Sequence, residues 1–94
     1  MFVRMVIGEA ASEEHLREFV EIVQGNAPAM REQPGLQRTD LMVEEDGRMA
    51  VLLTVWDSRE HCLQYHSSRP YRQFVAKTQH LLVGNFVVKL FRME

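Results

Sequence analysis

His66 is the residue of this sequence whose type and position best suit acid–base chemistry. Cys62 and Leu63 lie four and three residues before it, so on a helix all three share one face, which we predict to be the inner face. Because an imidazole titrates near neutrality, His66 could act there as a general base or bind a ligand. The competing interpretation is a histidine in the core or at its rim with a backbone partner.

Cys62 and His66 also have the i, i+4 spacing of metal ligands on one helix. No convincing third ligand accompanies them in the sequence. We therefore interpret Cys62 as a small buried thiol and predict no metal site.

Three aromatic residues lie close to His66 in the chain. Trp56 ends an apolar stretch just before the predicted helix and could line a pocket for a flat aromatic ligand. A lone tryptophan at such a place is more often packed in a core or an interface. The hydroxyls of Tyr65 and Tyr71 could bind a ligand oxygen or simply reach solvent.

Arginines near these positions could contact an anion. Arg69 and Arg72 lie where the helical pattern breaks, and they could guard the mouth of a pocket or simply be solvated. Arg4 has apolar neighbours in the first predicted strand. It could pair with an acidic residue of another chain or contact an anion.

Hydrophobic spacing and turn signals predict the elements that position these residues. Ser12 is a good N-cap, and apolar residues follow it at helical spacing. Pro28 could end this helix near Gly25-Asn26 or kink it, and the good helix formers around Pro28 favour one long kinked helix. Pro34-Gly35 ends that helix, and Asp46-Gly47 predicts a hairpin turn. The predicted order is strand 2–7, helix 12–32, strand 36–44, strand 48–56, helix 58–66, a helix from 70 to the stop at 84–85, and strand 86–92.

This order is the βαββαβ pattern of a ferredoxin-like α+β fold. It predicts a four-stranded antiparallel sheet with the helices on one face. Asp57 and Glu60 have the spacing of a capping box at the start of the short helix. We expect residues 1–94 to form a single domain, since the chain shows no linker and no repeat.

Composition narrows the class of protein further. The chain has 94 residues, 46% hydrophobic and 26% charged, with a net charge of −2. No basic stripe or long apolar run appears, so we expect neither nucleic-acid nor membrane binding. A single cysteine excludes an internal disulfide framework and suits a reducing cytoplasm, where we expect the protein to reside.

The predicted strands are apolar on both faces. Residues 49–56 contain no charged side chain on either face of the predicted strand, and residues 2–7 and 86–92 are nearly as apolar. One layer of helices covers only one face of a sheet. We therefore predict a homodimer that packs sheet against sheet; the alternative is an exposed sheet with scattered apolar residues.

Several short motifs together resemble the antibiotic biosynthesis monooxygenase family, whose members are dimeric α+β barrels. They are Pro34-Gly35-Leu36, the strand end Thr54-Val55-Trp56-Asp57-Ser58, and the stretch from Tyr65 to Tyr71. The resemblance spans essentially the whole chain. It implies a homodimer with one pocket per protomer between helices and sheet. It also implies oxygenation of a phenolic substrate by dioxygen without metal, flavin or haem.

The resemblance carries two residues over directly. Trp56 falls at a tryptophan that often ends this strand, and His66 falls at a histidine before the serine-rich helix break. The residues of the haem-degrading branch are absent, because Arg4 or Met5, Tyr65 and Val75 stand at those positions. The asparagine that the cofactor-free oxygenases carry in the third strand is also absent from Val51-Leu52-Leu53.

Three hypotheses for the function follow. The first is a cofactor-independent monooxygenase for an aromatic or quinone-like molecule, with His66 as the base or the orienting donor and with Trp56, Tyr65, Tyr71 and Arg69 in contact with the substrate. The second is a non-catalytic ligand-binding or stress-associated module on the same scaffold. The third is a structural dimer whose pocket is filled by its own side chains.

Overall fold

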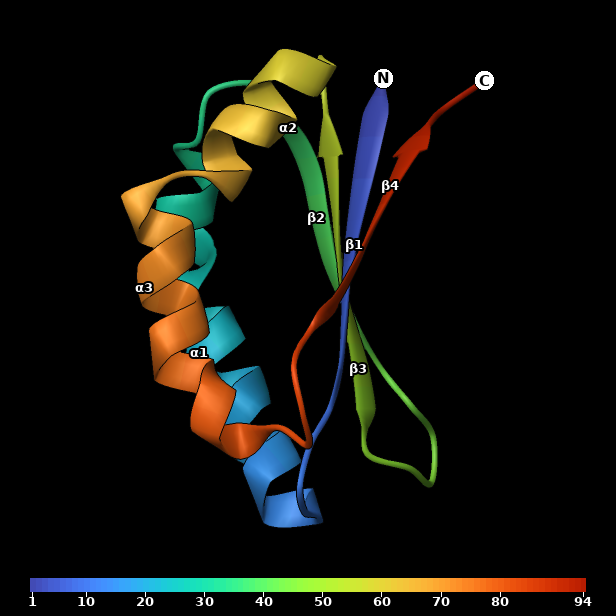
Figure 1. The fold of residues 1–94 in the computed structure, drawn as a ribbon, viewed down its shortest axis with the longest axis vertical. Helices are drawn as coiled ribbons and strands as arrows, with labels where there is room; N and C mark the ends of the chain where they lie inside the picture. Colours follow the sequence, from blue (N-terminus) through green and yellow to red (C-terminus); the bar gives the residue numbers. More distant parts are fainter.

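The strands form one antiparallel sheet in the computed structural model, which describes residues 1–94 (Figure 1). The strands are β1 (Phe2–Glu9), β2 (Leu36–Val43), β3 (Met49–Trp56) and β4 (Val87–Arg92), and their order in the sheet is β2-β3-β1-β4. β1 pairs with β3 on one side and with β4 on the other. This arrangement confirms the predicted ferredoxin-like α+β fold.

The helices lie together on one side of the sheet, and no element covers the other side (Figure 1). They are α1 (Glu13–Arg31), α2 (Arg59–His66) and α3 (Arg69–Thr78), followed by the short 3₁₀ helix η1 (Gln79–Leu81). No helix is long and apolar enough to cross a membrane.

Serine side chains begin all three α-helices. The hydroxyl oxygens of Ser12, Ser58 and Ser68 each accept the backbone N–H three residues further along. Each satisfies an N–H group that the first turn of a helix leaves free. The predicted capping box from Asp57 to Glu60 is therefore wrong. Ser58 is the cap, and the Asp57 carboxylate accepts instead from the ring of His61 at 2.7 Å.

The helix that follows Pro70 ends earlier than predicted. α3 stops at Thr78, and the chain then tightens into η1. The Thr78 hydroxyl donates to the carbonyl of Phe74 at 2.9 Å, a local hydrogen bond that apolar spacing does not reveal. The first helix, in contrast, runs through Pro28 to Arg31, as expected.

The two faces of the sheet have different surroundings. Alternate residues of β1 and β3 lie under the helices, and they include the fully buried Trp56. The aromatic rings of Phe19 and Phe74 pack with this side of the sheet in the main core. The residues that alternate with these lie on the uncovered face and are partly exposed. The apolar ones are Val3, Met5, Ile7, Met49, Val51 and Leu53.

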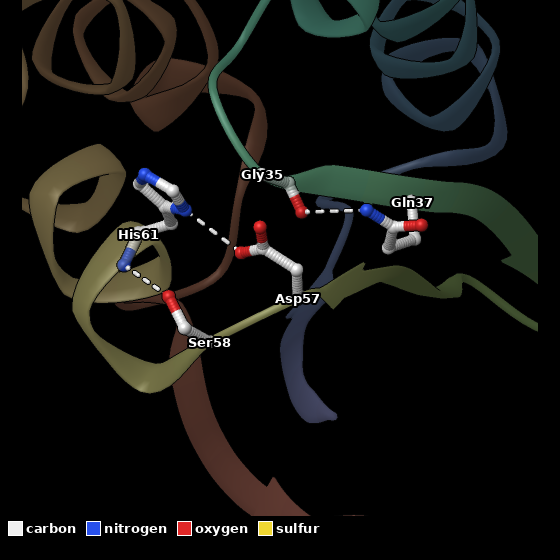
Figure 2. A network of polar contacts seen from close by, with 5 residues as sticks. All are labelled: Gly35, Gln37, Asp57, Ser58 and His61. Carbon is white, nitrogen blue, oxygen red and sulfur yellow. Dashed lines mark hydrogen bonds and ion pairs between the residues drawn. The ribbon is translucent and has the colours of Figure 1, made fainter.

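Gly35 joins α1 to β2 in a backbone conformation that favours glycine, with φ of 82°. Its carbonyl accepts the backbone N–H of Asp57 at 2.8 Å. Figure 2 shows the carbonyl beside the Asp57–His61 pair, with a longer contact from the side-chain amide of Gln37. A Cβ atom at this position would collide with the His61 ring and the Asp57 carboxylate.

We therefore expect Gly35→Ala to destabilise the protein by about 1–3 kcal/mol, the usual cost of a strained backbone position. Gly25→Ala is the matched control, because position 25 lies in α1 with open space around it. There alanine is expected to stabilise by about 0.5–1 kcal/mol. Urea unfolding at equal protein concentration measures both, and equal midpoints for the two variants would contradict this account.

Candidate functional site

Arg4 is the least expected residue of the buried side of the sheet. In β1 it pairs with Thr54 of β3 and with Leu90 of β4, and the residue is only 1% exposed. The alternation of β1 places it with Phe2 and Val6 under the helices. Its side chain thus does not reach the uncovered face, where it could pair with another chain. It lies inside the single chain, between the sheet and the helices.

Three rings surround the Arg4 guanidinium, and we call these four residues the Arg4 cluster. Nη2 donates to Nδ1 of His66 at 3.1 Å. The guanidinium carbon lies 4.3 Å from the centroid of the Tyr71 ring and 5.7 Å from that of Tyr65. Both distances are within the range of cation–π attraction. The cluster thus stabilises the cation through ring electrons and a neutral imidazole.

No carboxylate neutralises this charge. The ion pairs of the chain are Arg38–Asp40, His61–Asp57 and Arg92–Glu94. Nε of Arg4 is a buried side-chain donor with no hydrogen-bond partner. Arginine stays protonated in proteins, and an unpaired buried charge is costly. The Arg4 cluster therefore holds a positive charge with unused hydrogen-bonding capacity.

His66 lies at the edge of this cluster, and its predicted place on the inner face is wrong. The residue is exposed at the end of α2, although its ring packs on Tyr71 with centroids 5.3 Å apart. Because arginine can only donate, Nδ1 of His66 must be the accepting, unprotonated nitrogen. Partial burial of the ring and the positive charge of Arg4 both lower the pKa of His66. The neutral form then carries its proton on Nε2.

Two other ionisable side chains near Arg4 keep their protons at neutral pH. Burial raises the pKa of Tyr65 to about 12, although the charge of Arg4 acts in the opposite direction. Burial likewise raises the pKa of the Cys62 thiol, and Cys62 is fully buried. A thiolate is therefore disfavoured at this position. The structure contains no group of three or more acidic, histidine or cysteine side chains that could hold a metal ion.

The remaining residues predicted for the site lie in different places. Trp56 is fully buried; its ring stacks on Tyr65 at 5.3 Å, and its Nε1 donates to the hydroxyl of Thr54. The stacked Trp56 ring therefore holds the Tyr65 ring in position. Arg69 is exposed at the start of α3 and does not join the Arg4 cluster.

Two hollows meet the cluster through its tyrosines. The first, which we call the α1 cavity, has a volume of about 170 Å³ and is mostly apolar. It is lined by Val23, Gln24, Asn26, Ala27, Met30, Arg31, Thr39, Leu41, Leu52, Tyr65 and Phe74. The second is a groove of about 270 Å³ between α3 and β4, and Tyr71 forms part of its wall. A ligand in either hollow would contact a ring that also packs near Arg4.

Sequence reasoning missed most of the wall of the α1 cavity. Val23 and Ala27 belong to the apolar spacing that predicts the long helix, and such spacing gives no sign of a gap. The central place of Arg4 was detectable, since it shares the parity of Phe2 and Val6. A charged residue on the core-facing side of a central strand is rare, so it can indicate a functional residue.

The fold defines the chain as an α+β protein of ferredoxin-like topology with a candidate ligand cavity between helices and sheet. Residues 2–77 match the family model of the antibiotic biosynthesis monooxygenases, and the chain belongs to this family. No curated protein matches it significantly in sequence.

Solved structures resemble the fold at low sequence identity. A Deinococcus radiodurans protein is 16% identical, with a TM-score of 0.88 over 100% of this chain and 93% of its own. The Streptomyces coelicolor monooxygenase ActVA-Orf6, in complex with nanaomycin D, is 18% identical, with a TM-score of 0.87 over 99% and 87%. The cofactor-independent oxygenase SnoaB of Streptomyces nogalater is 17% identical, with a TM-score of 0.83 over 99% and 92%.

The contact between Arg4 and His66 predicts the titration of the imidazole. We expect a pKa of His66 below 6.5, with the proton of the neutral ring on Nε2. Arg4→Met should raise this pKa without fully restoring it, because burial remains. Since the folded pKa is the lower one, this contribution to stability is present above pH 6.5 and is lost as the pH falls through the folded value.

Proton–nitrogen NMR of the imidazole rings measures both the pKa and the tautomer. A neutral ring protonated on Nδ1, or a pKa that Arg4→Met leaves unchanged, would contradict the contact.

Proposed function

We propose that this protein is a cofactor-independent monooxygenase that oxidises an aromatic or quinone-like small molecule. The observation that carries the proposal is the contact of His66 with Arg4 in a cluster whose Tyr65 also lines the apolar α1 cavity, in a chain of the antibiotic biosynthesis monooxygenase family. The cofactor-independent oxygenase SnoaB, which has the same fold, supports it.

The proposed reaction uses dioxygen as the oxidant. A ring methylene next to a phenol becomes a carbonyl; one oxygen atom enters the product, and the other leaves as water with the two methylene hydrogens. Such a substrate reacts more readily with dioxygen after it has lost a proton. The protein's part is to bind it, orient it and assist the proton transfer.

His66 is the proposed base. Its lowered pKa keeps the imidazole neutral at pH 7, so a lone pair is present. In the free protein, Nδ1 accepts from Arg4, and the protonated Nε2 can only donate. His66 therefore acts as a base once a substrate hydroxyl takes the place of the Arg4 contact. Tyr65 and Tyr71 supply ring surface; Trp56 holds Tyr65 in position.

Arg69 lies apart from the other proposed substrate contacts. It lines neither hollow, and its side chain makes no hydrogen bond within the protein. Its proposed role is limited to attracting an anionic molecule at the surface near the Arg4 cluster.

A homodimer through the uncovered face of the sheet is the proposed assembly. This face presents Met5 and Leu53 on the central strands and the half-exposed Phe91 at one edge. Contiguous apolar surface of this kind typically marks a protein interface. A two-fold arrangement would bury the same patch on both copies.

A non-catalytic binding module is the second candidate. Leu52 is the β3 residue that lines the α1 cavity, so this strand offers the cavity an apolar side chain and no amide. A site without such a polar group suits binding better than catalysis.

Oxygen uptake with a panel of anthrones and hydroquinones tests the proposal. We expect uptake above the uncatalysed rate, and His66→Gln should lower kcat by about 10²–10⁴, the typical contribution of a general base. His80→Gln is the control, because His80 is an exposed histidine of η1 outside the cluster. Saturable binding without uptake would favour the binding module, and full activity of His66→Gln would remove His66 from the mechanism.

Sedimentation velocity tests the assembly. We expect a dimer at micromolar concentration, and Leu53→Lys should dissociate it because each copy would bring an unpaired charge into the apolar interface. Val83→Lys is the control, since Val83 is 54% exposed in the loop before β4. A monomeric wild-type protein would contradict the proposed interface.

A further inference from the structure

The α1 cavity adjoins a second hollow at the edge of the sheet. This hollow, which we call the β2 hollow, has a volume of about 470 Å³ and lies between the end of α1 and the edge strand β2. It is lined by Arg31, Leu36, Gln37, Arg38 and Thr39. Arg31 and Thr39 also line the α1 cavity, so the two hollows meet at these residues.

The turn after α1 brings Arg31 near Thr39. Arg31 is the last residue of α1, and Gly35 takes the chain back into β2. In β2, Thr39 pairs with the buried Thr54 of β3, which lies on the helix side of the sheet. The side chain of Thr39 therefore faces the α1 cavity, and the exposed side chain of Arg31 lies at the mouth of that cavity.

Arg31 is a cation with free hydrogen-bonding capacity. It takes part in none of the ion pairs of the chain, whereas Arg38 is already paired with Asp40 at 2.6 Å. The hydroxyl of Thr39 makes no hydrogen bond within the protein, although the side chains just before it do. No acidic side chain lines either hollow, and the neighbouring Glu32 lies outside both. An anion at this mouth would meet a free guanidinium and a free hydroxyl.

The two hollows differ in polarity, and together they select a ligand with two unlike ends. The α1 cavity is mostly apolar, and Tyr65 and Phe74 supply ring surface to it. The β2 hollow has only one apolar side chain, that of Leu36. A guanidinium binds a carboxylate through two parallel hydrogen bonds. An aromatic ring that carries a carboxylate arm therefore matches both hollows.

Another cation lies near the α1 cavity but is placed less well. A hollow of about 410 Å³ between α1 and α3 shares Asn26 and Phe74 with the cavity and contains Lys77. Lys77 lines that outer hollow alone and does not line the cavity. An ammonium group also lacks the planar fork that matches a carboxylate. Lys77 is thus the natural comparison for Arg31.

We propose that Arg31 and Thr39 form a carboxylate subsite at the mouth of the α1 cavity, and that the ligand is an aromatic molecule with a carboxylate side arm. The ring lies among the apolar side chains of the cavity, and the carboxylate accepts from the Arg31 guanidinium and the Thr39 hydroxyl. A carboxylic acid is already ionised at pH 7, so binding needs no proton transfer. The inference rests on the proposed function only in placing the ligand in the α1 cavity; it involves neither His66 nor dioxygen.

Calorimetric titration with matched acids and amides tests the subsite. The probes are phenylacetate and 2-naphthylacetate, and their controls are the corresponding amides, which have the same shape and no charge. We expect at least one carboxylate to bind, and its amide to bind about three- to tenfold more weakly, the effect of one partly exposed ion pair with good geometry. Added salt should weaken only the carboxylate. Binding of neither acid, or equal affinities of acid and amide, would overturn the inference.

Variants identify the residues that bind the carboxylate. Arg31→Met should lower the affinity for the carboxylate to that of the amide, and Arg31→Lys should recover only part of it, because the planar fork is missing. Thr39→Val should weaken the carboxylate about threefold or more, the loss of one hydrogen bond. An affinity that Thr39→Val leaves unchanged would overturn the part of Thr39.

Lys77→Met and Arg17→Met are the controls, since they make the same change of net charge at exposed positions outside the α1 cavity. Neither should change the affinity for the carboxylate. A loss of affinity in Lys77→Met, with Arg31→Met unchanged, would place the carboxylate in the hollow between α1 and α3 and overturn the inference.

Methyl NMR of the wild-type protein locates the ring without a variant. Binding of 2-naphthylacetate should shift the methyl signals of Met30, Leu41 and Leu52, which line the α1 cavity. The signals of Leu82 and Val88, which line the groove between α3 and β4, should stay in place. The reverse result would overturn the placement of the ring.

Two further results separate this inference from its neighbours. Acetate or phosphate that binds as tightly as 2-naphthylacetate would overturn the requirement for a ring. A protein that binds the carboxylate through Arg31 but takes up no oxygen would retain this inference and lose the proposed oxygenase function. Oxygen uptake in a protein that binds acids and amides equally would do the opposite.

Discussion

A positive charge without a counter-ion inside the core is the constraint on which the helix side of this structure depends. Arginine does not lose its proton, so the fold must stabilise Arg4 as a cation. It does so with two tyrosine rings and one imidazole nitrogen, all supplied by the region where α2 ends and α3 begins. Ser68, the cap of α3, separates these helices and lets both turns approach one guanidinium.

The elements of the fold were largely predictable, because each begins or ends at a residue with a strong local preference. Ser12 caps α1, and Gly35 supplies the positive φ that takes the chain into β2. Where prediction failed, a side-chain hydrogen bond decided the local structure. Asp57 bonds to the ring of His61 and leaves the cap to Ser58, and the hydroxyl of Thr78 bonds back to the helix that it ends.

The site was less predictable, for a geometric reason. Four residues turn an α-helix through about 400°, so residues at i and i+4 are offset by about 40°. Cys62 therefore faces the core while His66, at the last position of α2, turns toward solvent. The face that Arg4 shares with Phe2 and Val6 could have indicated its place under the helices, but the sequence analysis did not assign it there. Its partners come from α2 and α3, and no strand pattern reveals them. The α1 cavity depends on side-chain packing across five elements, which spacing along one element cannot show.

Strand β1 connects the two sides of the sheet. Its side chains alternate between them, so Arg4 lies in the core and Met5 lies on the uncovered face. A 94-residue chain has a thin core, so an unpaired buried charge removes a large share of its small net stability. Burial of more apolar surface would offset that cost. The uncovered face of the sheet is the broad apolar surface that a second copy could bury. A buried charge of this kind is therefore easier to maintain in the proposed dimer than in a monomer. The stability of the protein should then depend on its concentration, because the proposed interface forms only in the associated state.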